Sequence, residues 1–141
     1  MRILFLCTGN SCRSQMAEAW TRALHPHLEA YSAGVEKHGL NPWAMRVLKE
    51  AGLDTSRLFS KTTDELPVQE FDVVITLCSH AQENCPFFPG ATRRMHRGFD
   101  DPPRMVTPDM DEAEILGVYR RVREEIRRFV ERLPAEIGAS A

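Results

Sequence analysis

One stretch near the N-terminus, Cys7-Thr-Gly-Asn-Ser-Cys-Arg-Ser14, constrains the fold of this chain more than any other. It follows a continuous apolar run at residues 2–6, which is typical of a buried strand in a parallel sheet. It precedes a segment at residues 13–24 with the spacing of an amphipathic helix. A loop between such a strand and a helix N-terminus can turn successive backbone N–H groups toward an anion. The stretch therefore predicts an α/β fold with a ligand site beyond the carboxyl end of its first strand.

Strands and helices alternate along the rest of the chain. Asn41 and Pro42 are typical of a helix start and Gly52 of a helix end, and Asp109 with Glu112 forms a capping box for a later helix. Alternating elements are joined by right-handed crossovers, so we expect a small parallel sheet with helices on both faces. The pattern predicts further strands at residues 28–32, 72–77 and 92–96, and helices at residues 42–51 and 109–133.

Length and composition indicate one globular domain. With 141 residues, 43% of them hydrophobic, the chain can bury enough surface to fold without disulfides or a metal. We expect a single catalytic domain at residues 1–133 and a flexible C-terminal tail at residues 134–141. The net charge of −2 argues against nucleic acid as a partner. No apolar run approaches the roughly 20 residues of a membrane span, and residues 1–6 are too short for a signal peptide, so a cytoplasmic location with reduced cysteines is expected.

The chemistry of residues 7–14, here called the oxyanion loop, points to a thiol nucleophile facing an oxyanion. Backbone donors and a helix dipole that hold an anion also favour the thiolate form of Cys7. Arg13 offers a planar fork for two oxygens, and the Ser14 hydroxyl can hydrogen-bond the sulfur. Gly9 and Asn10 tolerate a left-handed backbone. Taken singly, Cys7 could instead be a small buried residue and Arg13 a surface residue. The predicted oxyanion-binding residues are Thr8, Gly9, Asn10, Ser11, Cys12, Arg13 and Ser14.

A general acid is expected on the segment Phe99-Asp-Asp-Pro102, which lies between the last predicted strand and the last predicted helix. A departing oxide or alkoxide needs a proton, and loops at the rim of a rigid sheet carry such donors. The spacing does not show whether Asp100 or Asp101 reaches the site. The alternative is that both aspartates simply belong to a turn beside the prolines.

A second cysteine cluster comes directly after a predicted strand. It begins at Cys78 and ends at Cys85, with the sequence Cys78-Ser-His-Ala-Gln-Glu-Asn-Cys85. Cys78 should therefore lie at the same sheet edge as Cys7. Ser79 and Gln82 form a capping box, which predicts a short helix that ends at Cys85. Three thiols near one anion site suggest electron transfer by thiol–disulfide exchange.

Two other interpretations of this cluster stay open. Its cysteines could be unreactive buried residues. They could also bind zinc, although their spacing is wider than in the common zinc ribbons. The zinc ligands would be Cys78, His80, Cys85 and His96.

These motifs together resemble a known family. The oxyanion loop resembles the phosphate loop of the low-molecular-weight protein tyrosine phosphatase fold. With Thr76-Leu-Cys-Ser-His-Ala-Gln-Glu-Asn-Cys-Pro86 and Gly98-Phe-Asp-Asp-Pro102 added, the chain resembles a thioredoxin-coupled arsenate reductase of that superfamily. The likeness runs from residue 2 to about residue 129. It includes the shorter motifs Tyr31-Ser-Ala-Gly34, His38-Gly-Leu-Asn-Pro42 and Ser60-Lys-Thr-Thr-Asp64.

The resemblance implies a four-stranded parallel sheet flanked by helices and a reduction of arsenate to arsenite through three cysteines. By resemblance, Cys7 attacks arsenate held by the loop and Arg13, and Asp101 protonates the departing oxygen. Cys78 then attacks the Cys7–arsenic adduct, which releases arsenite and leaves a Cys7–Cys78 disulfide. Cys85 attacks Cys78, and thioredoxin reduces the resulting Cys78–Cys85 disulfide.

The resemblance also implies a potassium ion beside the loop in some members, while the chemistry itself requires no cofactor. Oxygen-bearing side chains suit such a hard cation. Lys61 is adjacent in sequence to one of the matching positions and would weaken a cation site. The matching positions are Asn10, Glu18, Ser32, Thr62 and Asp64.

Two other functions use the same loop. A tyrosine phosphatase needs Cys7, Arg13 and Asp101 but neither of the later cysteines. In those phosphatases an aromatic residue typically follows the Asp-Pro pair, whereas Pro103 follows it here. The missing aromatic residue and the two extra cysteines favour a small inorganic oxyanion. A non-enzymatic oxyanion or redox sensor would use the same disulfide, and only turnover distinguishes it from an enzyme.

Overall fold

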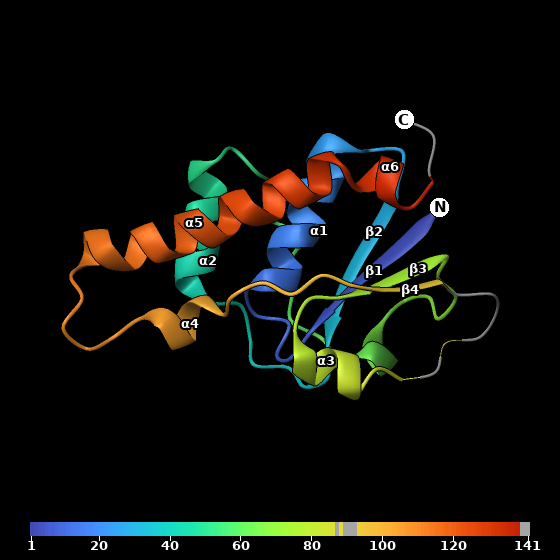
Figure 1. The fold of residues 1–141 in the computed structure, drawn as a ribbon, viewed down its shortest axis with the longest axis horizontal. Helices are drawn as coiled ribbons and strands as arrows, with labels where there is room; N and C mark the ends of the chain where they lie inside the picture. The colour runs from blue at the N-terminus through green and yellow to red at the C-terminus, as the bar shows by residue number, and fades with distance from the viewer. Residues whose placement is uncertain (87, 89–92, 139–141) are drawn as a thin grey trace.

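Four parallel strands form the centre of the protein in a computed structural model that describes residues 1–86, 88 and 93–138 (Figure 1). Their order across the sheet is β2-β1-β3-β4. The sheet confirms the predicted α/β fold and all predicted strands, with small shifts at their ends. Thr92, predicted in the last strand, lies outside the described residues. The strands are β1 (Arg2–Cys7), β2 (Glu29–Gly34), β3 (Val73–Thr76) and β4 (Arg93–His96).

Strands β2, β1 and β3 end at one level, and this positions the site. β1 occupies the centre because its side chains are apolar, and each fully buried leucine or isoleucine contributes roughly 1.5–3 kcal/mol. Leu6 of β1 stands opposite Ala33 of β2 and Thr76 of β3. The segments that follow β1 and β3 therefore meet at one edge of the sheet. This confirms the prediction that Cys7 and Cys78 share an edge.

One face of the sheet carries a thick helical layer. α1 packs on β1 and β2, and α5 crosses over α1 and α2 (Figure 1). The main core lies between these helices and the sheet, around Phe5, Ile75, Met16 and Ile126. None of the helices in the described part of the chain has the length and apolar character of a membrane span. The helices of this layer are α1 (Arg13–Leu24), α2 (Pro42–Glu50), α5 (Glu112–Glu131) and α6 (Leu133–Glu136).

The other face carries a thinner layer. It consists of α3 (Ser79–Glu83), the short 3-10 helix η1 (Thr63–Glu65) and connecting segments, and α3 lies on the opposite side of the sheet from α5 in Figure 1. A smaller core fills this side around Leu4, Val74 and Ala81. Both faces are covered, as predicted, but unequally. The thin layer carries Cys78 and Cys85.

The start of α5 differs from the prediction. Two overlapping Asp-x-x-Glu patterns precede this helix, and the structure uses the second. The Asp111 carboxylate accepts the N–H of Glu114 at 2.8 Å, whereas Asp109 and Glu112 were predicted to form the box. Asp109 instead accepts the Thr107 hydroxyl at 2.5 Å in the preceding turn. Because Asp109 bonds to Thr107 and does not cap the helix, the helix starts two residues later than predicted.

The C-terminal segment also differs from the expected flexible tail at residues 134–141. Leu133 and Pro134 are buried in α6, and Ile137 is buried after it. The carbonyl oxygen of Glu136 accepts a hydrogen bond from Arg93 Nη2 of β4 at 3.3 Å. The packed domain therefore extends to at least residue 137. Residues 139–141 of the expected tail lie outside the described residues.

Candidate active site

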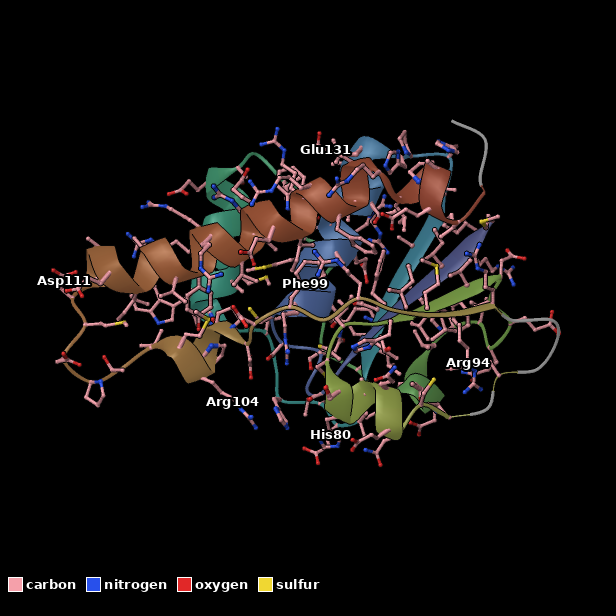
Figure 2. All side chains as sticks on the ribbon, in the orientation of Figure 1. His80, Arg94, Phe99, Arg104, Asp111 and Glu131 are labelled. Carbon is pink, nitrogen blue, oxygen red and sulfur yellow. The ribbon has the colours of Figure 1, made fainter. Side chains whose placement is uncertain are left out.

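A cavity of about 800 Å³ opens at the carboxyl edge of the sheet. The oxyanion loop, the start of α3 and the segment around α4 (Pro102–Met105) form its walls. In Figure 2, Phe99 and Arg104 mark the α4 side of this cavity and His80 marks the α3 side. The predicted site residues that line it are Cys7, Thr8, Gly9, Ser11, Cys12, Arg13, Cys78 and Asp101.

Cys7 lies at the end of β1, and its sulfur is held by the loop itself. Its Sγ lies 2.9 Å from Oγ of Ser14, the contact that the sequence predicts. The Ser14 hydroxyl accepts a hydrogen bond from Nδ2 of Asn10 at 2.7 Å. Because the amide is the donor in that bond, the hydroxyl proton is free to point at the sulfur and stabilise a thiolate. All three residues are buried, so water screens this bond little.

All residues of the oxyanion loop are described, and the backbone is left-handed at one of them. Asn10 has a φ of +48°, as expected, but Gly9 does not have a positive φ. A Cβ at Gly9 would lie 2.2 Å from Nδ1 of His38, so the exposed His38 side chain would have to move to accept one. A Cβ at Gly34 would likewise meet the Thr8 carbonyl oxygen at 2.8 Å. Both glycines let neighbouring segments approach the loop backbone.

Arg13 is the first residue of α1 and is 7% exposed. Its Nη1 donates to the carbonyl oxygen of Phe99 at 3.1 Å, and its Nη2 lies 3.7 Å from Oδ2 of Asp101. The Phe99 carbonyl thus fixes the guanidinium plane at the cavity wall. A fixed plane is what two-point binding of an oxyanion requires.

The two neighbouring aspartates have different surroundings. Asp100 pairs with Nη2 of Arg121 on α5 at 3.2 Å, and its side chain is 63% exposed. The Asp101 side chain is 29% exposed and lies beside Arg13 and Arg104, each at 3.7 Å. Arg121 thus holds Asp100 toward the surface. Asp101 is the carboxylate next to the predicted oxyanion position, a choice that spacing alone left open.

Cys78 caps α3 with its own side chain. Its Sγ accepts the N–H of Ala81 at 3.4 Å, so the cap lies one residue before the predicted Ser79. The same sulfur lies 3.3 Å from Oγ1 of Thr8 in the oxyanion loop. The backbone N–H of Ala81 and the Thr8 hydroxyl thus hold this sulfur at the wall of the large cavity. The only sequence signal for the Thr8 contact is that Thr8 follows Cys7.

Cys85 does not line the large cavity. It lies beyond the end of α3, which is shorter than predicted, and lines a separate cavity of about 220 Å³ between α3 and β4. Its thiol donates to the carbonyl oxygen of Pro86 at 3.6 Å. The structure therefore brings Cys7 and Cys78 together and keeps Cys85 apart from them.

The zinc interpretation is wrong for this arrangement. Across residues 1–86, 88 and 93–138, no three His, Cys, Asp or Glu side chains are grouped so that they could hold a metal. All four proposed ligands, Cys78, His80, Cys85 and His96, are among the described residues. Nδ1 of His96 instead lies 2.8 Å from Oγ1 of Thr76.

Cys12 is buried beneath the loop at the start of α1. Its side chain makes no capping hydrogen bond, and burial raises the pKa of its thiol. The thiol therefore stays protonated at neutral pH and is a poor nucleophile. Cys12 and the other three cysteines are free thiols.

A buried polar network supports the loop from behind. Oε1 of Glu18 accepts the Ser32 hydroxyl at 2.7 Å, and Ser32 accepts Nδ2 of Asn10 at 3.0 Å. Nζ of Lys61 lies 4.0 Å from Glu18 and donates to the carbonyl oxygen of Phe59 at 2.9 Å. Burial lowers the pKa of Lys61, and the Glu18 charge opposes that shift. We call Asn10, Ser32, Glu18 and Lys61 the Glu18 network.

The residues predicted for potassium do not fit a cation site. Oδ1 of Asn10 accepts the Lys61 N–H and Nε2 of Gln15, each at 3.0 Å, which uses both of its lone pairs. The Thr62 hydroxyl donates to Asp64 at 2.5 Å near η1. The ammonium group of Lys61 already supplies a positive charge beside the buried carboxylate of the Glu18 network.

Comparisons with known proteins agree with this geometry. A family model described as low molecular weight phosphotyrosine protein phosphatase matches residues 2–140. A curated arsenate reductase of Halalkalibacterium halodurans is 47% identical over 137 residues, 96% of each chain. A solved arsenate reductase from Archaeoglobus fulgidus matches with a TM-score of 0.72 and 33% identity over 96% of this chain and 98% of that chain. A thioredoxin-dependent arsenate reductase of Corynebacterium glutamicum matches with a TM-score of 0.68 and 26% identity over 97% of this chain and 60% of that one.

Proposed function

Because the chain belongs to the low molecular weight phosphotyrosine protein phosphatase family and its relatives include arsenate reductases, we propose that it reduces arsenate to arsenite. Cys7 and Cys78 supply the two electrons, and Cys85 regenerates Cys7. The observation that carries the proposal is that Cys7 and Cys78 line one cavity. A phosphatase needs only the first of these thiols, so the second thiol favours reduction.

Arsenate binds first, as a tetrahedral oxyanion in the oxyanion loop. The N–H groups of the loop and the N-terminus of α1 face its negative charge. Arg13 binds two oxygens through its planar fork, which the Phe99 carbonyl holds in place. The site is ready before the substrate arrives, and such preorganised donors usually accelerate a reaction of this kind more than any other single effect.

The first chemical step joins Cys7 to arsenic. The thiolate, stabilised by the Ser14 hydroxyl at 2.9 Å, attacks arsenic, and a sulfur–arsenic bond forms. An arsenic–oxygen bond breaks in the same step. Asp101, which lies 3.7 Å from Arg13, gives its proton to the departing oxygen, which leaves as water.

The second step reduces arsenic. Cys78 attacks the sulfur of Cys7, a disulfide forms, and the electron pair of the sulfur–arsenic bond stays with arsenic, which leaves as arsenite. The hydrogen bond from the Ala81 N–H and the Thr8 hydroxyl support Cys78 as the attacking thiolate.

The third step requires movement. Cys78 and Cys85 stand at opposite ends of α3 and line different cavities. A disulfide needs α-carbons about 4.4–6.8 Å apart, whereas the five residues of α3 rise about 1.5 Å each and hold the two cysteines in separate cavities. We therefore expect α3 to unwind when Cys85 attacks Cys78. A single isolated turn of helix is marginal in water, so this change costs little.

Thioredoxin is the proposed donor that reduces the Cys78–Cys85 disulfide. The thioredoxin-dependent relative of Corynebacterium glutamicum supports this choice. A thiol relay needs reduced cysteines between turnovers, which supports a cytoplasmic location. No metal is proposed as a cofactor, since Arg22 at 3.0 Å and Lys61 at 4.0 Å already place positive charge beside the Glu18 carboxylate.

A coupled assay tests the proposal. With thioredoxin, its reductase and NADPH, we expect NADPH oxidation that depends on arsenate. In the same assay Cys85→Ser should release about one arsenite per enzyme molecule and then stop with Cys7 bonded to Cys78, because the third thiol is missing. Rapid hydrolysis of an aryl phosphate without any arsenate turnover would favour a phosphatase instead.

A further inference from the structure

The smaller cavity contains a contact that the three steps above do not use. There the carbonyl oxygen of Pro86 accepts two hydrogen bonds, from the Cys85 thiol at 3.6 Å and from Nη2 of Arg94 at 3.2 Å. Thiol and guanidinium therefore converge on one atom. We propose that Arg94 is a positioning residue that holds the Cys85–Pro86 segment on β4 and stabilises the Cys85 thiolate for its attack on Cys78. This inference rests on the proposed three-cysteine mechanism.

The strand register explains why Arg94 faces this cavity. Arg94 pairs with Val74 of β3, whose side chain belongs to the core beneath α3. Successive residues of a strand point to opposite faces. Arg93 accordingly reaches the other layer, where its Nη2 donates to the Glu136 carbonyl of α6 at 3.3 Å. Figure 2 shows Arg94 on the α3 side of β4.

The charges around Cys85 are few. Burial raises the pKa of its thiol, and the positive charge of Arg94 acts against that shift. His96, also on β4, is the other ionisable side chain that lines the cavity, and its Nδ1 is occupied by the Thr76 hydroxyl at 2.8 Å. α3 and β3 contribute lining residues that do not titrate. Arg94 is thus the charged group best placed to favour the thiolate.

The role of Arg94 in the third step follows from this geometry. When Cys85 loses its proton to solvent, its hydrogen bond to Pro86 is lost, but Arg94 still holds the carbonyl and keeps its charge near the sulfur. The thiolate then attacks Cys78 in the Cys7–Cys78 disulfide. A Cys78–Cys85 bond forms, the Cys7–Cys78 bond breaks, and Cys7 leaves with the electron pair as a thiolate.

The first test isolates Cys85 in the full chain. In a variant with Cys7, Cys12 and Cys78 each changed to Ser, Cys85 is the remaining thiol, and serine at position 78 can still cap α3. The rate of alkylation by iodoacetamide is measured against pH. Arg94→Gln should move this profile to higher pH, and Arg94→Lys, which keeps the charge, should restore most of it. The matched control Arg93→Gln should leave the profile unchanged, and an unchanged profile in Arg94→Gln would overturn the proposal.

The second test follows the third step in a single turnover, with all cysteines present. Arg94→Gln should slow conversion of the Cys7–Cys78 disulfide to the Cys78–Cys85 disulfide by roughly two- to five-fold, as expected for loss of an ion pair open to solvent. The initial release of arsenite should keep its rate. Equal slowing of both steps would contradict a role specific to Cys85. Because alkylation involves no arsenate, a shifted profile in a protein that fails to reduce arsenate would refute the proposed function and leave the coupling of Arg94 to Cys85 standing.

Discussion

The two cysteine regions of this protein are built in opposite ways. In the oxyanion loop, Cys7, Asn10 and Ser14 are buried and bonded to one another. In α3, only Ala81 is buried, and the helix spans five residues on the thin side of the sheet. The first region lies between a central strand and a long helix, whereas the second can detach without opening the main core.

The difference matches what the proposed mechanism requires of each region. Attack on an oxyanion requires donors fixed before the substrate binds, and burial provides that fixation. A disulfide relay requires one sulfur to meet two partners in turn, so its segment must move. Segments with few buried contacts open at low free energy. Under the proposed relay, the same sheet edge thus carries one site that stays rigid and one that must move.

The largest expected effect separates the two regions by activity. Cys7→Ser should abolish both arsenate reduction and any side hydrolysis of aryl phosphates, because the attacking atom is gone. Cys78→Ser and Cys85→Ser should lose arsenate turnover but keep that hydrolysis, since it uses the rigid site alone. Initial rates with both substrates measure this. Loss of hydrolysis in all three variants, with folding intact, would show that the regions are not separable.

The next effect concerns the acid beside the rigid site. Asp101→Asn should retain arsenate binding and lose on the order of 10²–10⁴ in rate, the usual contribution of a general acid. Asp100→Asn is the matched control, because Arg121 holds that side chain toward the surface. Steady-state rates with arsenate decide between them. A greater loss in the Asp100 variant would show that Asp101 is the wrong carboxylate.

A smaller effect is expected where the loop supports its thiolate. Ser14→Ala removes the hydroxyl 2.9 Å from Cys7, and a hydrogen bond to a charged group is worth about 1.5–3 kcal/mol, or roughly 10–100-fold in the first step. Thr8→Val should instead slow arsenite release, since Thr8 contacts Cys78. Rapid-quench measurement of the two steps distinguishes them. Identical effects of both variants on both steps would remove the distinction between the regions.

The smallest effect lies away from both regions. Hydrogen bonds from Arg120 and Arg123 lower the pKa of Glu50 to about 2 from an ordinary value of 4.5. This carboxylate therefore contributes stability that is full above the ordinary value and is lost as the pH falls toward 2. Glu50→Gln should lower the melting temperature slightly at pH 7, with a difference that shrinks below pH 4.5, and leave arsenate reduction unchanged. A difference that stays constant with pH would contradict the assignment.

Much of the rigid region could be predicted from the sequence. Local signals specify it: the apolar run of β1, the loop residues and the helix that begins at Arg13. The contact of Ser14 with Cys7 followed from their places in that loop. What the sequence could not show came from distant residues, such as the approach of His38 to Gly9 and of Lys61 to Glu18.

The mobile region was less predictable, because its contacts join segments far apart in the chain. The capping residue of α3 is Cys78 rather than Ser79, since its sulfur accepts the Ala81 N–H. Spacing also could not show that Cys85 faces β4 and not the large cavity. Arg94 carried no signal in the sequence, because only the pairing of β3 with β4 brings it to Pro86.

Amide hydrogen exchange compares the two regions most directly. It is measured on the fully reduced protein and on the form with a Cys78–Cys85 disulfide. The account predicts that amides of residues 79–86 exchange much faster in the oxidised form, because α3 has unwound, while amides of residues 8–14 keep their protection. Equal protection of residues 79–86 in the two forms would contradict the claim that α3 unwinds on oxidation while the oxyanion loop stays rigid.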